Sequence, residues 1–360
     1  MTDMTRKLSI IVIAMLAAVS AGAGTPVFRT IKSNPVTPVK DQYYSGTCWC
    51  HASTALMESE AIRILGIRDE AAYPDFSELY TVSRAYEDRA VRYIRMDGHI
   101  TSGPGSLGGD LLHVVEDWGI VPQSAMPGKT ELPQLRDMDK EIRAYLDQIR
   151  ANHGRLKGDW KKGLVKILDR TMGECPEKFT VDGKEYTPAS YRDAMGIVPG
   201  DYLTFSSFTH VPFNDHFIID VPDNWRWDTA FNIPLDELVE TVRSAVLNGY
   251  TVAWGTDISE PGFSYESGLG FIPEKEVTQE SRQRGYDVKE TVDDHMMLIY
   301  GLAEDEQGNS WFMVKNSAGI VGPFDGMMYC SEDFFKAKTI YLTLHKDGVP
   351  QHIRDKFVEK

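Results

Sequence analysis

The segment from Gln42 to Trp49 places a cysteine directly before a helical repeat, and this arrangement constrains the fold more than any other feature. After Cys48, small and apolar residues recur at helical spacing, and Gly66 is a suitable helix end: Ala52, Ala55, Leu56, Ser59 and Ile62. The pattern therefore predicts a helix that begins at Cys48. The free N–H groups and the dipole at a helix N-terminus favour the thiolate over the thiol.

Two apolar runs in the last third of the chain predict an antiparallel hairpin. The runs span 295–302 and 311–315, and the polar turn between them, 304–309, contains a glycine. The midpoint of positions 295 and 316 is 305.5, which lies inside this turn. We therefore expect His295 and Asn316 to lie near each other across the two strands.

Other patterns outline the rest of the chain. A glycine-rich loop at 102–109 precedes one helical pattern, and the region 132–223 is polar and mixed, which we interpret as an elaboration on a core fold. The predicted helices are 110–118, 137–152 and 235–247, and 250–254 is predicted as a buried strand.

The residue types at these positions suit nucleophilic attack on a carbonyl carbon. Cys48 is the expected nucleophile and His295 the group that takes its proton, because the thiolate is the nucleophilic form. Asn316 would orient the imidazole through its side-chain oxygen. The side-chain amide of Gln42 and the backbone N–H of Cys48 would stabilise the oxyanion. Gly46 would let a substrate approach the loop closely.

Each of these residues also has an ordinary structural interpretation. A lone cysteine is usually a small buried hydrophobe, and a lone histidine is more often satisfied within a core. Asn316 alone suits a turn, and Gln42 alone suits an exposed surface. Their joint occurrence is what favours a catalytic site.

A metal site is the alternative interpretation of Cys48, Cys50 and His51. Zinc sites usually need a second pair of ligands, and no second cluster with such spacing occurs in the sequence. Cys50 and His51 would also project in different directions from a helix that begins at Cys48. We therefore predict no metal and no other cofactor.

The composition suggests a soluble chain large enough for two domains. The chain has 360 residues, 42% of them hydrophobic, and a formal net charge of -15. Such an acidic chain repels phosphate backbones, which argues against nucleic-acid binding. The absence of short-period repeats in the sequence argues against a solenoid.

The first residues have the order of a secretory signal. The basic pair at 6–7 precedes an apolar run at 8–19, and small residues follow at 20–23. We expect cleavage after Ala21 or Ala23, export to the periplasm or the medium if the source is bacterial, and no stable membrane span afterwards. The alternative is an uncleaved membrane anchor, for which the apolar run is short.

The cysteines do not form a disulfide scaffold. There are four in a long chain, Cys48, Cys50, Cys175 and Cys330. Cys175 and Cys330 could pair, or both could be buried thiols, and the sequence leaves the two alternatives open.

Taken together, these residues resemble the papain-like cysteine peptidases, and more closely the branch of bleomycin hydrolase and bacterial aminopeptidase C. The shared pattern is Gln, three residues, Gly, one residue, then Cys-Trp, and the last residue of this pattern is Trp49. Ser45 stands where papain-type members have a disulfide-forming cysteine, as in that branch. Further stretches that resemble the family are 108–110, 118–122, 186–188, 232–238, 295–296 and 315–317.

The resemblance implies an α+β, papain-like fold of two domains with an active-site cleft between them. The implied segments are a signal peptide at 1–23, a helical domain with the nucleophile at 24–130, a family-type insertion at 131–230, a strand-rich, β-barrel-like domain at 231–345 and a C-terminal tail at 346–360. The implied substrate-binding residues are Gly46, Trp49, Gly108, Gly109 and Asp110. The implied activity is hydrolysis of peptide substrates through a thioester acyl-enzyme, with an aminopeptidase favoured.

Three features depart from the family pattern. Ala318 stands where the family has a tryptophan that shields the Asn–His hydrogen bond, the branch is typically intracellular, and residues 355–360 differ from the family arm whose carboxylate anchors a substrate's free amine. An open-cleft endopeptidase and a catalytically degenerate peptide-binding protein are therefore the alternatives. Side-chain preference and homo-oligomer formation are left open by the sequence.

Overall fold

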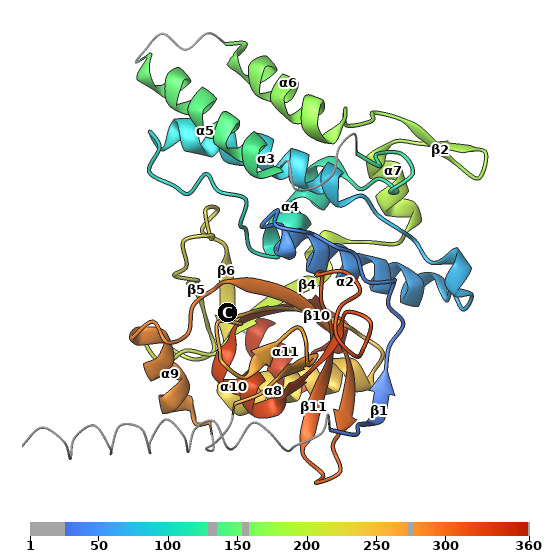
Figure 1. The fold of residues 1–360 in the computed structure, drawn as a ribbon, viewed down its shortest axis with the longest axis vertical. Helices are drawn as coiled ribbons and strands as arrows, with labels where there is room; N and C mark the ends of the chain where they lie inside the picture. Colours follow the sequence, from blue (N-terminus) through green and yellow to red (C-terminus); the bar gives the residue numbers. More distant parts are fainter. Residues whose placement is uncertain (1–25, 129–134, 153–157, 273–276, 359–360) are drawn as a thin grey trace, which may run out of the picture.

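A helical half and a strand-rich half make up the described chain (Figure 1). The computed structural model describes residues 26–128, 135–152, 158–272 and 277–358. The predicted signal peptide, 1–23, lies outside these described residues.

A buried helix, α2 (Cys48–Leu65), lies where the two halves meet. Every side chain from Trp49 to Ile62 is buried. A helix enclosed by protein on all sides needs no polar face, which explains why small and polar residues share its length with apolar ones. The helix ends at Gly66, whose φ of 64° is a left-handed conformation that glycine adopts freely. These bounds confirm the predicted helix and make Cys48 its first residue.

Five further helices form the helical half. They are α3 (Glu78–Arg95), α4 (Gly109–Trp118), α5 (Leu135–Ala151), α6 (Trp160–Met172) and α7 (Pro188–Ala194). The Ser77 hydroxyl caps α3 by accepting a hydrogen bond from the N–H of Tyr80. Apolar residues of α5 and α6 pack against α3 and join one core with those of α2. The predicted helices at 110–118 and 137–152 are thereby confirmed within a residue or two.

One mixed sheet is the basis of the strand-rich half. Its order is β5-β6-β4-β13-β7-β10-β11-β12-β9-β8, and β1 pairs with β10 off this path. The strands are β1 (Arg29–Ser33), β4 (Tyr202–Ser206), β5 (Asp215–Ile218), β6 (Thr229–Asn232), β7 (Val252–Thr256), β8 (Phe263–Ser264), β9 (Leu269–Gly270), β10 (His295–Glu304), β11 (Ser310–Lys315), β12 (Met327–Ser331) and β13 (Thr339–His345). The barrel-like closure of this sheet stays a prediction.

Protein covers both faces of the sheet. On one face, Met296, Leu298 and Tyr341 pack into the core that contains α2. The other face is covered by α8 (Leu235–Leu247), α10 (Glu332–Lys338) and α11 (Gln351–Val358), with α9 (Gln279–Asp287) beside α10. The sheet therefore lies between the nucleophile helix and a second helical layer, which holds β10 and β11 rigidly.

The hairpin of β10 and β11 forms as predicted, with its turn displaced. Glu304 pairs with Ser310, which centres the turn on residue 307. A register shift between Ile299 and Gly301 moves the pairing by one residue in the part nearer His295. His295 consequently begins β10, and Asn316 follows directly after β11.

Residues of the predicted insertion, 131–230, are distributed over both halves. The helices α5 and α6 lie on α3, whereas β4 and β5 belong to the main sheet. A small hairpin, β2 (Phe179–Val181) and β3 (Lys184–Tyr186), leads into α7. The domain boundaries given from the sequence stay a prediction.

The C-terminal tail is helical where the structure describes it. A 3-10 turn, Lys346–Gly348, precedes α11, and the ring of Phe357 packs near those of Phe205 and Phe231. The sequence left the role of this tail open, and residues 351–358 form a helix, which differs from the extended arm of the family. Apolar contacts with the strand-rich half explain the difference, because an extended tail would leave Ile353 and Phe357 exposed.

All four cysteines are free thiols. Cys330 is buried in β12 and Cys175 is half-buried, so the disulfide left open from the sequence does not form. In the ranges that the structure describes, no helix combines the length and apolar character needed to cross a membrane.

Candidate active site

A pocket with a cavity of about 330 Å³ collects residues from both halves of the protein. Gln42, Gly46 and Cys48 come from the helical side, and His295 comes from β10. The rest of its lining is a glycine-rich loop, three carboxylates and two large side chains: Gly103, Pro104, Gly105, Ser106, Asp223, Asp293, Asp294, Met296 and Tyr341. The structure thus brings the predicted nucleophile, base and oxyanion donor into one cavity.

His295 and Asn316 form a direct hydrogen bond. The Nε2 atom of His295 lies 2.8 Å from Oδ1 of Asn316. The same oxygen accepts a hydrogen bond from the backbone N–H of Ser317 at 2.8 Å, which identifies it as an acceptor and fixes the orientation of the amide. Nε2 therefore carries the imidazole proton, and Nδ1 is left as the acceptor for a proton from a thiol.

Ser317 also fixes the side chain of Gln42. Its hydroxyl donates to Oε1 of Gln42 at 2.6 Å, and the backbone N–H of Gln42 donates to the carbonyl of Ser317 at 2.8 Å. Because the amide oxygen is occupied, the NH₂ group of Gln42 is free to donate to an oxyanion. Sequence reasoning gave Ser317 no role, and its place directly after Asn316 was the available signal.

The charge state of Cys48 differs from the sequence expectation. Burial raises the pKa of Cys48 to about 12; hydrogen bonds from the backbone N–H groups of Met296 and Trp49 oppose this rise, whereas Asp293 and Asp223 add to it. Burial likewise lowers the pKa of His295, against the effect of its bond to Asn316. The predicted preference for thiolate is therefore outweighed, since burial disfavours both charged forms. A neutral thiol and a neutral imidazole are expected in the free protein.

Gly46 lines the pocket as predicted, whereas the predicted substrate-binding residue Trp49 is buried behind it. Gly46 has a φ of 72°, and a Cβ atom there would lie 2.7 Å from Cγ of Pro104. Both facts require glycine at this position. Trp49 is 2% exposed and its indole N–H donates to the carbonyl of Pro104 at 2.9 Å. The role of Trp49 in this geometry is to hold the glycine-rich loop against α2.

Gly108, Gly109 and Asp110 do not line this pocket. Asp110 is 1% exposed and its carboxylate pairs with Nε of Arg226 at 2.5 Å, so this side chain is not available to a substrate. The backbone N–H of Gly108 donates to the hydroxyl of Tyr341 at 3.0 Å, and Gly109 faces a second hollow beside His113. The glycine-rich loop reaches the pocket earlier, at 103–106.

Cys50 and His51 have structural partners. The thiol of Cys50 donates to the carbonyl of Glu78 at 3.5 Å, and Nδ1 of His51 lies 3.0 Å from the carbonyl oxygen of Thr47. Within the described ranges, no three side chains of His, Cys, Asp or Glu are grouped so as to hold a metal ion.

Tyr265 and Met328 lie beside Asn316, and the sequence did not predict either neighbour. Ala318 forms a bridge with Asp41 instead of covering the site. The amide of Asn316 contacts the sulfur of Met328 at 3.2 Å. Burial raises the pKa of Tyr265, the neighbouring Cys48 acts in the same direction, and a polar contact with Asn316 opposes them. These two side chains therefore contact Asn316, the residue that a tryptophan covers in the family pattern.

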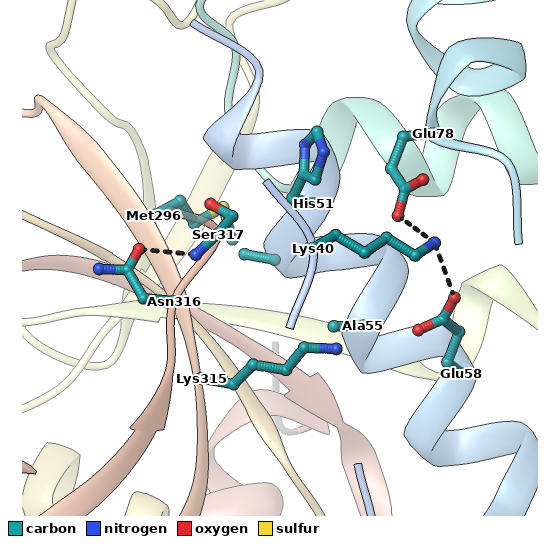
Figure 2. Close-up of a pocket in the computed structure, with 10 residues that line it drawn as sticks. Lys40, His51, Ala55, Glu58, Glu78, Met296, Lys315, Asn316 and Ser317 are labelled. Atoms are coloured by element: carbon teal, nitrogen blue, oxygen red, sulfur yellow. Dashed lines mark hydrogen bonds and ion pairs between the residues drawn. The ribbon is translucent and has the colours of Figure 1, made fainter. Parts of the chain in front are cut away.

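A buried charge cluster lies behind the site, formed by Lys40, Glu58, Glu78 and Lys315 (Figure 2). Lys40 Nζ lies 2.7 Å from Glu78 and 3.5 Å from Glu58, which is on α2. Lys315, the residue before Asn316, donates to the hydroxyl of Thr37 at 2.7 Å. The cluster ties the segment before Gln42 and the end of β11 to the nucleophile helix.

Comparisons with known proteins identify the family and the relatives of this chain. A family model with the description "Peptidase C1-like family" matches residues 6–360 of this chain. Aminopeptidase C of Listeria monocytogenes is 21% identical, with 89% of this chain and 82% of the relative covered. The mitochondrial cysteine proteinase 1 of Saccharomyces cerevisiae is 20% identical, with 92% and 79% covered. The crystal structure of PepW from Lactobacillus rhamnosis superimposes with a TM-score of 0.74 at 17% identity over 99% of this chain and 91% of that one, which is a likeness of fold.

Proposed function

We propose that this chain, which belongs to the peptidase C1-like family, is a cysteine peptidase that removes N-terminal residues from peptides. The observation that carries the proposal is the 2.8 Å bond between His295 and Asn316 at the pocket that contains Cys48 and Gln42. A nucleophile, an oriented base and an oxyanion donor in one cavity are the requirements for acyl transfer. The similarity to aminopeptidase C supports the choice of an aminopeptidase.

The reaction would proceed through a thioester. As the sulfur of Cys48 attacks the peptide carbonyl, Nδ1 of His295 takes the thiol proton. The backbone N–H of Cys48 and the NH₂ group of Gln42 receive the negative charge on the oxygen. The imidazolium then protonates the leaving amine, and the C–N bond breaks. Water, deprotonated by the same ring, hydrolyses the thioester and returns the free thiol, so that no cofactor is needed.

Replacement of each of the two neighbouring thiols tests the nucleophile. Cys48→Ala should lower kcat to background, because no other group at the pocket forms the thioester. Cys50→Ala should keep most of the activity, since Cys50 is buried against Glu78 and serves as the matched control. Hydrolysis of fluorogenic aminoacyl amides is the measurement. Full activity in Cys48→Ala would overturn the proposal.

Paired substrates distinguish the alternatives within the family. An aminopeptidase cleaves peptides with a free amine and spares N-blocked ones, whereas an open-cleft endopeptidase cleaves both. A degenerate family member would bind peptides without turnover. The intact set of Cys48, His295, Asn316 and Gln42 favours turnover.

Export is a further part of the proposal. The basic, apolar and small residues of 1–23 support removal of a signal peptide and action outside the cytoplasm. N-terminal sequencing of protein from the native cell should give a start at Gly22 or Gly24. An intact Met1 on protein in the cytoplasm would contradict it.

A further inference from the structure

The loop between β5 and β6, residues 219–228, extends from the sheet toward the helical half (Figure 1). One of its residues, Asp223, lines the pocket. Arg226 on this loop pairs with Asp88 on α3 at 2.7 Å and with Asp110 on α4 at 2.5 Å. The indole N–H of Trp225 donates to the hydroxyl of Ser106 at 2.9 Å. Two hydrogen bonds of the Asn224 side chain join the ends of the loop. Its Nδ2 donates to the carbonyl of Ile219 at 3.0 Å, and its Oδ1 accepts from the backbone N–H of Asp228 at 2.8 Å. The loop is therefore a fixed bridge over one part of the cleft.

The bridge places Asp223 at the pocket. Its carboxylate touches the glycine-rich loop so closely that a Cβ atom on Gly105 would lie 1.9 Å from Oδ2. Behind that loop, the buried Arg89 donates to the carbonyl of Gly105 at 2.7 Å. Burial raises the pKa of Asp223 and the charge of Arg89 opposes the rise. Asp223 is therefore aimed at the cavity, with its nearest cation on the far side of the glycine-rich loop.

Asp293 lines the same cavity two residues before His295. Neither Asp223 nor Asp293 has a hydrogen-bond or ion-pair partner among the described residues, whereas Asp294 accepts from the N–H of Ile258 at 2.9 Å. No lysine or arginine belongs to the described lining of the pocket. Burial, Asp223 and Asp294 raise the pKa of Asp293 well above its ordinary range. A cation that arrives with a ligand would favour the charged form of both carboxyl groups, so the cavity is complementary to such a cation.

An independent observation locates that ligand. His295 is 8% exposed and lines the cavity, and its Nδ1 atom has no hydrogen-bond partner in the described part of the chain. An acceptor left open on a buried side chain, in the pocket that contains Cys48, indicates where the thiol proton is received and hence where the scissile peptide lies. The unpartnered carboxylates lie in the same cavity as this atom.

We propose that the loop 219–228 closes the cleft next to Cys48 and that Asp223 and Asp293 receive the free N-terminal ammonium group of the substrate. This inference rests on the proposed function, because it takes Cys48 as the nucleophile. The carboxylates come from within the fold: α11 packs through Phe357 against Phe205 and Phe231. The positive ammonium group of the substrate and the negative carboxylates of the pocket attract each other. Closure of the cleft leaves no room for a substrate that extends further on the N-terminal side.

Alkylation of Cys48 tests the proposal without requiring turnover. The probes are alanyl chloromethyl ketone with a free amine, its N-acetyl derivative and Nα-acetyl-lysyl chloromethyl ketone. In each case a thioether bond forms from the sulfur of Cys48, chloride leaves, and the thiol proton passes to solvent. Mass spectrometry of the full chain gives the second-order rate constants. The wild-type protein should react roughly 10- to 100-fold faster with the free-amine probe than with the acetylated one, since a charge-assisted pair discriminates by about that factor.

Asp223→Asn and Asp293→Asn should each reduce this ratio by roughly 10-fold, by loss of rate with the free-amine probe alone. The matched control is Asp220→Asn, which removes a charge from the same loop at an exposed side chain (71%) outside the pocket and should keep the ratio. Thermal unfolding of each variant shows that it is folded. An unchanged ratio in both Asp223→Asn and Asp293→Asn would overturn the proposal, as would an equal loss with both probes.

The lysyl probe separates the two sources of an ammonium group. Slow reaction, like that of the acetylated alanyl probe, supports binding of the N-terminus, and reaction as fast as the free-amine probe overturns it. Peptide hydrolysis is measured alongside. Selective alkylation without hydrolysis would refute the proposed peptidase and leave the ammonium site standing, whereas hydrolysis without selectivity would do the reverse.

Discussion

Replacing Glu58 by alanine should destabilise the protein by about 4 kcal/mol. The Glu58 side chain is 1% exposed; its carboxylate accepts hydrogen bonds from the Thr37 hydroxyl and, at 2.9 Å, from the N–H of Phe76. Removing one partner of a buried ion pair costs about 3–5 kcal/mol, because the remaining charge is left uncompensated. In Glu58→Ala, the charge left without compensation is Lys315, which donates to the Thr37 hydroxyl that in turn donates to Glu58; burial lowers the pKa of Lys315 and the charge of Glu58 opposes this. In this variant, Lys40 keeps its ion pairs with Glu78 and Asp75.

Thermal unfolding measures this loss. A chain of this length has an unfolding entropy of roughly 0.7 kcal/mol/K, so 4 kcal/mol lowers Tm by about 6 °C if unfolding is one cooperative transition. Activity should also fall at temperatures below Tm, because Lys315 directly precedes Asn316. The control Glu306→Ala, at an exposed position of the turn between β10 and β11, should change stability by less than about 0.5 kcal/mol.

A double variant decides whether compensation of charge is the cause. Glu58→Leu with Lys315→Met replaces the two charges by apolar side chains of similar volume, and it should recover most of the lost Tm. If Glu58→Ala melts within 1 °C of the wild-type protein, or if the double variant is no better than Glu58→Ala, the reasoning is refuted.

Three further predictions concern the site itself. Asn316→Ala should lower kcat/KM by roughly 10- to 100-fold and His295→Ala by more, because Asn316 orients the ring whereas His295 transfers the proton; equal losses in a fluorogenic assay would contradict these roles. Tyr265→Ala should lower kcat a few-fold by wetting the His295–Asn316 bond, and Tyr265→Phe should keep most of it; a loss as large in Tyr265→Phe would assign the effect to the hydroxyl. Because burial raises the pKa of Cys48 and lowers that of His295, the rate of alkylation by neutral iodoacetamide should rise steadily with pH above 7; a plateau across pH 5–8 would indicate a thiolate–imidazolium pair in the free protein.

Local patterns predicted the elements that carry the catalytic groups. Helical spacing after Cys48 and the left-handed glycine at 66 fix the bounds of α2, since both signals lie within the helix itself. Two apolar runs and a polar turn likewise predicted the hairpin of β10 and β11. They did not predict its register, because the spacing of residues does not indicate the shift between Ile299 and Gly301.

The parts that the sequence did not reveal depend on contacts between distant segments. Asp110 was expected to contact the substrate, and it instead forms an ion pair with Arg226, which lies 116 residues later in the chain. Asp223 and Tyr265 lie on loops without periodicity, and their positions follow from where those loops cross. The preference of Cys48 for the thiolate was argued from the helix terminus alone, whereas burial by remote segments raises the pKa of this thiol.

The pairing of β1 with β10 has a consequence for synthesis of the chain. Arg29 pairs with Glu304, which lies 275 positions later in the chain, so the first described strand has no partner until most of the polypeptide has left the ribosome. His295 and Asn316 arrive later still than the helix that bears the thiol. A nascent chain can therefore fold its early helices while the proposed hydrolytic centre does not yet exist, and that centre is complete only once translation of the last strands is finished.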